Sequence, residues 1–507
     1  MSATTVSELL TGGAADAAAI GGIDAAAMTY AGLAAQAERV ASALAAAGVR
    51  PNDRIAIVLP NGPEMATAFL CVACIATTAP LNPAYRTEEF AFYLEDLKAC
   101  ALLVEAGSDS PAVAAAVGLG VPVIELVPVE DGPAGAFDLR IPQLATPVAP
   151  ARAPNADDIA LVLHTSGTTS RPKIVPLSHG NVCASARNIT ATLSLAAGDR
   201  ALNVMPLFHI HGLMAAILAS LNAGASVVCT PGFDALRFFG WLDAASPTWY
   251  SAVPTMHQAI LTRARRNKEI IARARLRFVR SSSSSLPPQV LQELEEAFGV
   301  RVVEAYAMTE AAHQMTSNQL PPGDRKPGTV GIASGPDVRI MSESDPTLLD
   351  VGETGEIVIR GDNVTTGYDS NPQANADNFV AGWFRTGDQG VMDDDGFLTI
   401  TGRLKEIINR GGEKISPREV DDVLMDHPAV QQVVTFAMPH KSLGEDVACA
   451  VVLRDGADAT ERDLQDFVRE RAAAFKVPRK VLFLDEIPKG ATGKLQRIGL
   501  AEKLGIG

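Results

Sequence analysis

Short runs of β-branched and other apolar residues alternate with longer alanine-rich segments through the first half of the chain. Residues 53–59 read DRIAIVL, which is typical of a buried strand, and residues 63–76 have the composition and length of a helix. Because strands that alternate with helices build parallel sheets covered by helices, the pattern predicts an α/β fold. Residues 128–153, rich in Pro, Ala and Gly, are expected to form a connecting loop. Further strands are predicted at residues 101–105, 121–126, 160–163, 227–230, 249–253 and 277–280.

The pattern changes after about residue 325, where short strands and glycine turns dominate and indicate a small β-rich subdomain. A new mixed unit begins near residue 403. We therefore expect a large N-terminal domain over residues 1–402, built of two α/β subdomains and the β-rich one, and a small α+β C-terminal domain over residues 403–507. In the smaller domain, a helix is predicted at residues 417–426 and strands at residues 430–437 and 446–453.

Composition excludes several classes of protein. The 507 residues carry 43 Lys and Arg against 58 Asp and Glu, a formal net charge of −15, which argues against nucleic-acid binding through a general basic surface. Neither a signal peptide nor an apolar run of about 18 residues is present, so we expect a cytoplasmic protein with no membrane span. The six scattered cysteines are too few for a disulfide framework, and we interpret Cys71 and Cys74 as small buried residues on a helix face.

Five strings of residues carry candidate chemistry. Residues 165–173 read TSGTTSRPK after a predicted strand, and their hydroxyls, backbone N–H groups and Lys173 suit a cluster of anionic oxygens. The string is not a Walker A loop, because the Gly-x4-Gly-Lys-Ser/Thr spacing is absent. The other strings are YAMTE at residues 306–310, WFRTGD at 383–388, GRLKEIINRGG at 402–412 and PKGATGK at 488–494.

In this order the five strings resemble the motifs of the adenylate-forming superfamily, which includes acyl-CoA synthetases, luciferases and peptide-synthetase adenylation domains. Ala307 departs from the glycine of the family's Tyr-Gly-x-Thr-Glu. The resemblance implies an ATP-dependent acid–CoA ligase that forms an acyl-adenylate with release of pyrophosphate and then the thioester. It also implies ATP, Mg²⁺ and coenzyme A as cofactors, a mobile C-terminal domain, and a monomer or homodimer.

The resemblance also implies a role for each matching residue. Glu310 is the expected metal ligand, Lys405 the hinge, and the catalytic positions are Lys494, Thr309 and His209. Lys414 and Lys476 are weaker candidates for the phosphates of coenzyme A. The expected nucleotide and coenzyme A residues are Thr165, Ser166, Gly167, Thr168, Thr169, Lys173, Ser283, Ser284, Glu304, Ala305, Tyr306, Thr309, Asp388, Arg403, Gly411, Gly412 and Lys494.

The segments that line the family's acid pocket are unusually polar in this chain, with Arg280 adding charge. A helix over residues 309–314 would place Glu310 and His313 on one face. Because an unpaired buried polar group costs roughly 1–3 kcal/mol, a second carboxylate satisfies this pocket better than an aliphatic tail. The strings resemble those of oxalate–CoA ligases, so oxalate is the expected acid. The expected substrate-binding residues are His209, His211, Ser283 and His313.

Three alternatives stay open at the level of sequence. The chain could be an acyl-CoA synthetase for short- or medium-chain acids or for another dicarboxylate, a ligase that adenylates without coenzyme A, or a catalytically idle nucleotide-binding protein. The joint presence of Lys494, Glu310 and Asp388 argues against loss of catalysis.

Overall fold

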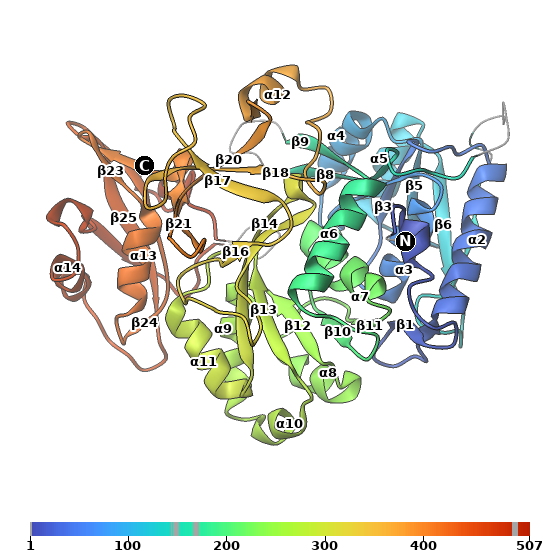
Figure 1. The fold of residues 1–507 in the computed structure, drawn as a ribbon, viewed down its shortest axis with the longest axis horizontal. Helices are drawn as coiled ribbons and strands as arrows, with labels where there is room; N and C mark the ends of the chain where they lie inside the picture. Colours follow the sequence, from blue (N-terminus) through green and yellow to red (C-terminus); the bar gives the residue numbers. More distant parts are fainter. Residues whose placement is uncertain (1–2, 143, 145–151, 166–171, 489–494, 507) are drawn as a thin grey trace.

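A mainly parallel sheet forms the N-terminal part of the molecule (Figure 1), a computed structural model that describes residues 3–142, 144, 152–165, 172–488 and 495–506. Only β7 and β9 among the strands of this sheet run antiparallel to their neighbours, at its two edges. In spatial order the strands are β7 (Phe137–Arg140), β6 (Val123–Pro128), β5 (Ala101–Glu105), β3 (Arg54–Val58), β4 (Thr77–Pro80), β8 (Ile159–Thr165) and β9 (Lys173–Ser178).

A second mainly parallel sheet follows in the chain and carries most of the candidate chemistry. Strands β1, β11, β10, β12, β13 and β14 are parallel, whereas β2, β15 and β16 pair antiparallel at the ends. In spatial order the strands are β16 (Ile332–Ala333), β15 (His313–Ser317), β14 (Arg301–Met308), β13 (Phe278–Ser282), β12 (Trp249–Ala252), β10 (Arg200–Asn203), β11 (Ser226–Cys229), β1 (Ala18–Gly21) and β2 (Met28–Thr29).

Helix α3 (Pro63–Ala73) joins the two sheets, since it contacts β4 of the first and β1 and β11 of the second. Every residue of α3 from Met65 onward is buried, as its nearly continuous apolar sequence requires. Cys71 is one of these buried residues, whereas Cys74 caps the helix and is half-buried. The interpretation of this Cys-x-x-Cys as packing residues therefore holds for Cys71, and Cys74 lies just beyond the helix.

The remaining helices cover the faces and edges of the two sheets (Figure 1). The first sheet is contacted by α2 (Tyr30–Ala46), α4 (Thr87–Leu97), α5 (Pro111–Leu119) and α6 (His179–Thr192), of which α2 and α6 also contact the second sheet. Helix α1 (Val6–Leu9) packs against α3 and α6. Around the second sheet lie the π-helix η1 (Gly212–Leu218), α7 (Ala219–Asn222), α8 (Phe238–Ala245), α9 (Pro254–Ala264), α10 (Lys268–Arg273), α11 (Pro288–Phe298) and the 3₁₀ turn η2 (Thr309–Ala311).

Antiparallel strands replace the α/β pattern after residue 325, as the glycine-rich sequence predicts. They are β17 (Asp337–Met341), β18 (Thr354–Arg360), β19 (Phe379–Val380), β20 (Trp383–Met392) and β21 (Leu398–Arg403), with α12 (Pro372–Asn378) beside them. The C-terminal part contains η3 (Leu404–Glu406), β22 (Ile408–Arg410), β23 (Glu413–Ile415), α13 (Pro417–Met425), β24 (Val430–His440), β25 (Gly444–Leu453), α14 (Glu461–Arg469), η4 (Ala474–Lys476), β26 (Lys480–Phe483) and α15 (Leu500–Lys503).

The predicted α/β class, with a large N-terminal and a smaller C-terminal part, is confirmed. Arg403 ends β21 and turn η3 follows, but the domain boundary at this residue stays a prediction. The loop predicted for residues 128–153 is wrong in part, because Phe137–Arg140 form β7 and pair with β6. An edge strand this short is stabilised by pairing with the neighbouring strand, and amino-acid composition does not reveal this pairing.

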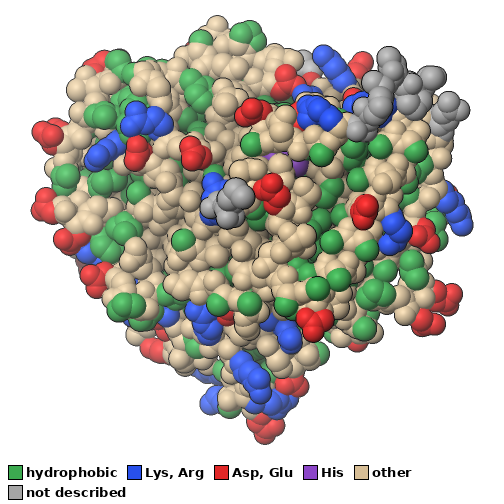
Figure 2. All heavy atoms as spheres, turned by 45° about the vertical axis from the view of Figure 1, so that its right-hand side comes forward, with side chains coloured by type: hydrophobic (Ala, Val, Ile, Leu, Met, Phe, Trp, Pro, Cys, Tyr) green, Lys and Arg blue, Asp and Glu red, His purple; other side chains and the backbone are tan. Residues whose placement is uncertain are grey.

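Charged side chains of both signs lie on the surface. On the face shown in Figure 2, Lys and Arg side chains are interspersed with Asp and Glu, and the described side chains of that face form no broad basic patch. Among the described residues, no helix combines the length and the apolar character that crossing a membrane would require.

Candidate active site

Polar side chains gather where four neighbouring strands of the second sheet end. His209 and His211 follow β10, Ser251 lies near the end of β12, Ser283 follows β13, and Glu310 follows β14. These four strands are parallel neighbours, so their carboxyl ends lie along one edge of the sheet. Ligands of open α/β sheets bind at this edge.

His211 is the centre of the candidate acid pocket. Its ring is buried, with Nε2 2.6 Å from the Ser251 hydroxyl and Nδ1 3.0 Å from the Ser283 hydroxyl. The rings of His211 and His313 stack with centroids 4.9 Å apart. His211 directly precedes the π-helix η1, a rare conformation that is frequent at functional sites. The structure thus brings together His211, Ser283 and His313, three residues predicted from separate segments.

The helix predicted over residues 309–314 is wrong. Turn η2 ends at Ala311, Ala312 and His313 have φ of 45° and 98°, and a right-handed helix cannot continue through two positive φ angles. His313 instead begins β15 and pairs with Met308 of β14. Consequently Glu310 and His313 do not lie on one helix face. The ring of His313 stacks on that of His211, whereas the carboxylate of Glu310 accepts a hydrogen bond from the Tyr368 hydroxyl.

Arg280 of β13 is a fully buried cation below these imidazoles. Its Nη1 lies 3.2 Å from Nε2 of His313 and 3.3 Å from the Ser251 hydroxyl, and its Nη2 lies 3.2 Å from Oε1 of Gln314. Burial lowers the pKa of Arg280 to about 9. Among the residues that the structure describes, no carboxylate pairs with this guanidinium.

Three other predicted residues lie near this cluster without joining it closely. His209 is half-buried, and its Nδ1 is 3.5 Å from the backbone N–H of His211. Ser284 is exposed on the turn after β13. Ala305 lies inside β14, where its carbonyl accepts a hydrogen bond from the Ser282 hydroxyl at 2.9 Å.

Asp388 links the second sheet to the β-rich segment. The Tyr306 hydroxyl donates to Oδ2 of Asp388 at 2.5 Å, and Arg403 Nε donates to Oδ1 at 2.8 Å. Strands β20 and β21 place Asp388 and Arg403 directly opposite each other. The structure therefore assembles the three residues that the sequence motifs associate with the nucleoside.

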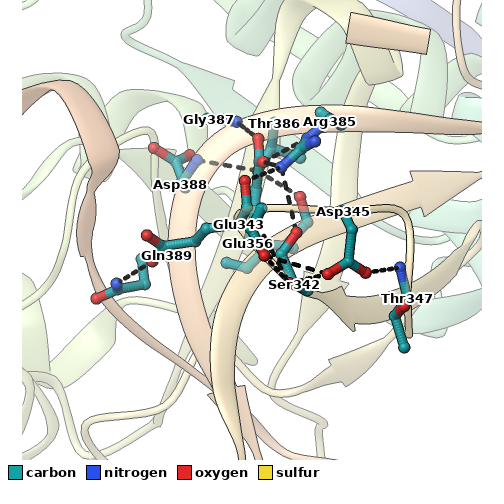
Figure 3. Close-up of polar contacts among 12 residues, drawn as sticks. Ser342, Glu343, Asp345, Thr347, Glu356, Arg385, Thr386, Gly387, Asp388 and Gln389 are labelled. Carbon is teal, nitrogen blue, oxygen red and sulfur yellow. Dashed lines mark hydrogen bonds and ion pairs between the residues drawn. The ribbon is translucent and has the colours of Figure 1, made fainter. Parts of the chain in front are cut away.

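The irregular part of β20 that presents Asp388 is held by a partly buried ion pair (Figure 3). Arg385 Nε lies 2.5 Å from Oε2 of Glu356, and Oε1 of the same carboxylate accepts the Gly387 N–H at 2.9 Å. The Thr386 hydroxyl accepts the Asp388 N–H at 3.1 Å. Sequence reasoning missed Glu356, because it lies in a neighbouring strand 29 residues from Arg385 and outside every recognised motif.

Glu310 faces Tyr368 and Lys173. The Tyr368 hydroxyl donates to Oε1 of Glu310 at 2.9 Å, and Lys173 Nζ lies 4.4 Å from the centroid of the Tyr368 ring. Burial raises the pKa of Glu310, whereas burial and the charge of Lys405 lower the pKa of Lys173. Tyr368 was also missed, since nothing in the sequence relates it to a residue 58 positions away.

The structure places the ends of the predicted phosphate loop beside Glu310. Thr165 ends β8 and pairs with Lys173 at the start of β9, while the intervening Ser166, Gly167, Thr168 and Thr169 lie outside the described residues. Thr309 begins turn η2, next to Glu310. Within the described part of the chain no three His, Cys, Asp or Glu residues form a metal cluster. A single buried carboxylate next to a phosphate loop nevertheless fits Mg²⁺, which keeps most of its water and binds substrate phosphates.

Glu304 is a buried carboxylate at the edge of this region. Its Oε1 accepts the Leu286 N–H at 2.8 Å, and its Oε2 has no hydrogen-bond partner among the described residues. Burial raises the pKa of Glu304 to about 7, and the charge of Arg418 on α13 opposes this rise.

The C-terminal candidates lie on turns. Lys405 is exposed in η3, and Gly411 and Gly412, with φ of 61° and 99°, join β22 to β23 in a two-residue turn that needs positive φ at both positions. Lys494 lies outside the described residues. Two further lysines make ion pairs in this structure: Lys414 lies 3.3 Å from Glu343, and Lys476 pairs with Glu419.

Comparison with known proteins agrees with this geometry. Residues 12–369 match the family described as AMP-binding enzyme, and residues 419–494 match the AMP-binding enzyme C-terminal domain. The oxalate–CoA ligase of Arabidopsis thaliana is 46% identical over 475 residues, covering 93% of this chain and 92% of that protein. The oxalate–CoA ligase of Saccharomyces cerevisiae is 43% identical, covering 89% of this chain and 87% of that protein.

A solved structure of similar fold supports the same family assignment. The crystal structure of ATP-bound MatB from Rhodopseudomonas palustris is 30% identical to this chain, with a TM-score of 0.89 and 99% of each chain covered. The resemblance that the five sequence strings indicated is thereby confirmed. The chain belongs to the family of AMP-binding enzymes.

Proposed function

We propose that this AMP-binding enzyme is an ATP-dependent acid–CoA ligase whose acid is oxalate. The observation that carries the choice of acid is the contact of His211 with both Ser283 and His313 in one polar cluster. A second carboxylate accepts hydrogen bonds from polar side chains such as the Ser283 hydroxyl, whereas an aliphatic tail accepts none. The two oxalate–CoA ligases that are 43% and 46% identical over most of the chain support the same choice.

Asp388 is the proposed acceptor for the ribose hydroxyls, with Arg403 beside it as a donor to the same hydroxyls. The carboxylate is already oriented by the Tyr306 hydroxyl and by the ion-paired part of β20 shown in Figure 3. Tyr306 offers its ring to the adenine, and Glu304 and Ala305 lie in the same strand. Glu310 is the proposed ligand of Mg²⁺, which would neutralise phosphate charge when bound.

The reaction runs in two steps. A carboxylate oxygen of the acid forms a bond to the α-phosphorus of ATP, and the bond from that phosphorus to pyrophosphate breaks. The thiolate sulfur of coenzyme A then forms a bond to the carbonyl carbon, AMP leaves with the oxygen, and the thiol proton goes to solvent. Because charge gathers on phosphoryl oxygens, the protein acts mainly by positioning and by electrostatic stabilisation.

The remaining roles follow from the motif resemblance. Lys494 is the proposed cation that touches the carboxylate and the α-phosphate, and Thr165, Thr309 and Lys173 are proposed phosphate donors. His209 is proposed at the entrance of the acid pocket. Lys405 is the proposed hinge at the domain boundary near residue 403, about which the Gly411–Gly412 turn would replace Lys494 at the site.

A pyrophosphate-release assay over mono- and dicarboxylic acids of two to eight carbons, run with and without coenzyme A, tests the proposal. Oxalate should be the preferred acid, AMP should accumulate, and a coenzyme A thioester should form only when coenzyme A is present. A preference for propionate or longer fatty acids would contradict the choice of acid. Adenylate formation that coenzyme A does not discharge would contradict the ligase itself.

A further inference from the structure

Tyr368 contacts two charged residues of the proposed phosphate and metal site. Its hydroxyl donates to Oε1 of Glu310 at 2.9 Å, and the Nζ atom of Lys173 lies 4.4 Å from the centroid of its ring. Tyr368 is buried, with 6% of the residue exposed. None of the five sequence strings includes it, although it lies between the carboxylate proposed for Mg²⁺ and the ammonium proposed for the phosphates.

The hydroxyl of Tyr368 restricts the orientation of the Glu310 carboxylate. An ionised carboxylate only accepts hydrogen bonds, so the hydroxyl is the donor. The bond engages Oε1 and not Oε2. Because a carboxylate held through one oxygen cannot turn freely, its other oxygen has a fixed direction in which it can bind a cation. Carboxylates that ligate metals are commonly hydrogen-bonded in this way, and loss of the partner typically costs about 10- to 100-fold in metal affinity.

The ring of Tyr368 acts on Lys173 through a different interaction. An ammonium over the face of an aromatic ring is attracted by the negative charge of that face, and the attraction is stronger where water is excluded. Lys173 begins β9, directly after the predicted phosphate loop. A carboxylate in place of the ring would neutralise this cation, whereas the ring holds the ammonium in position and leaves its charge available to an anion.

The segment that carries Tyr368 is bound to both of the elements that it bridges. The Thr365 N–H donates to the Glu310 carbonyl of η2 at 2.7 Å, and the Thr365 hydroxyl donates to the Pro176 carbonyl of β9 at 2.7 Å. On the other side of Tyr368, the Asp369 N–H donates to a second carbonyl of β9 at 3.0 Å. The backbone around Tyr368 is therefore fixed relative to η2 and β9, which carry the two charged side chains.

We propose that Tyr368 is a positioning residue that fixes the Glu310 carboxylate and the Lys173 ammonium relative to each other, so that a magnesium–ATP complex meets both charges at once. The inference rests on the proposed function, since it concerns the roles proposed there for these two residues. The two contacts have separate consequences. The hydroxyl acts on metal binding through Glu310, and the ring acts on phosphate binding through Lys173.

Equilibrium binding of ATP, measured by calorimetry without the acid, tests the two consequences separately and requires no turnover. Tyr368→Phe removes the hydroxyl and keeps the ring. This variant should bind ATP about 10- to 100-fold more weakly in saturating Mg²⁺ and with unchanged affinity in EDTA. Tyr368→Leu removes the ring as well, so it should also bind more weakly in EDTA, by about 2- to 30-fold.

Tyr30→Phe is the matched control. The Tyr30 hydroxyl is also buried and donates to the Ala225 carbonyl at 2.7 Å, so its loss should lower the melting temperature and leave both ATP affinities unchanged. A double variant shows whether the hydroxyl acts through the carboxylate. In a Glu310→Gln background, Tyr368→Phe should cause no further loss of ATP affinity in Mg²⁺.

Two results would overturn the inference. If Tyr368→Phe lowers only the melting temperature, as Tyr30→Phe does, Tyr368 is structural. If Tyr368→Phe weakens binding in Mg²⁺ equally with and without Glu310→Gln, its hydroxyl does not act through Glu310. Failure of the proposed function of Glu310 is distinguishable, because Glu310→Gln alone would then bind ATP in Mg²⁺ as tightly as wild type, and the inference would fall with it.

Discussion

Replacing Glu304 by glutamine tests how the buried carboxylate near α13 couples the stability of the protein to pH. Glu304 is 1% exposed, and only one of its oxygens has a hydrogen-bond partner among the described residues. Burial raises its pKa from an ordinary value of 4.5 to about 7 despite the charge of Arg418. Glutamine keeps the size and can still accept the Leu286 N–H, but it cannot ionise.

The direction in which stability changes with pH follows from the protons bound by the folded and unfolded states. Between pH 4.5 and 7 the folded protein retains a proton on Glu304 that the unfolded chain has released, so the stability of wild type falls as pH rises through this window. One pKa unit corresponds to about 1.36 kcal/mol, which gives a loss of about 2–3 kcal/mol between pH 5 and 8. Glu304→Gln does not have this pH-dependent loss. Between pH 5 and 8 the difference between its free energy of unfolding and that of wild type should therefore increase by the same amount.

Urea unfolding of both proteins at several values from pH 5 to 8 measures this difference, and other titrating groups cancel in it. Glu296→Gln, which removes an exposed carboxylate from α11, is the control and should follow wild type at every pH. A difference between wild type and Glu304→Gln that does not change with pH would refute the reasoning. The reasoning would also be refuted if the stability of Glu304→Gln relative to wild type decreased as pH rises, because Glu304 would then be ionised and paired.

Four further changes test the proposed site. Lys494→Ala should slow acyl-adenylate formation by about 100-fold or more while thioester formation from preformed acyl-adenylate survives, as separate half-reaction assays would show. Lys405→Pro restricts φ near −65° at the proposed hinge, so adenylation should persist while thioester formation falls; equal loss with a lowered melting temperature would indicate misfolding. His313→Ala should cost about 10- to 150-fold in kcat/KM for oxalate and spare propionate; equal loss on both would place His313 elsewhere in the mechanism. Tyr306→Phe removes the hydrogen bond to Asp388 and should raise KM for ATP with little effect on KM for the acid, measured by varying each substrate in turn.

Local patterns in the sequence were sufficient for much of the fold. The apolar runs at β3 and β5 identified buried strands, because a strand covered on both faces needs mostly apolar residues. The motif strings singled out Glu310 and Asp388 as candidates, because their residue types and order resemble those of the family. The structure then showed which side chains form hydrogen bonds with these two residues.

Only the tertiary structure decided how the acid pocket is built. Residues 309–314 had an acceptable helical spacing, but pairing of Met308 with His313 across β14 and β15 made a strand of its last residues. Propensity is a weak constraint there, because the ladder of a neighbouring strand supplies hydrogen bonds that a short helix cannot match.

The electrostatic character of the site was likewise invisible in the sequence. Arg280 contacts His211, 69 residues away, and Glu356 holds Arg385 from another strand. Whether a charge is paired or left without a counter-ion depends on which distant segments fold beside it. The amino-acid sequence therefore determined the reaction class through its motifs, whereas burial and strand pairing decided which groups lie together in the candidate site.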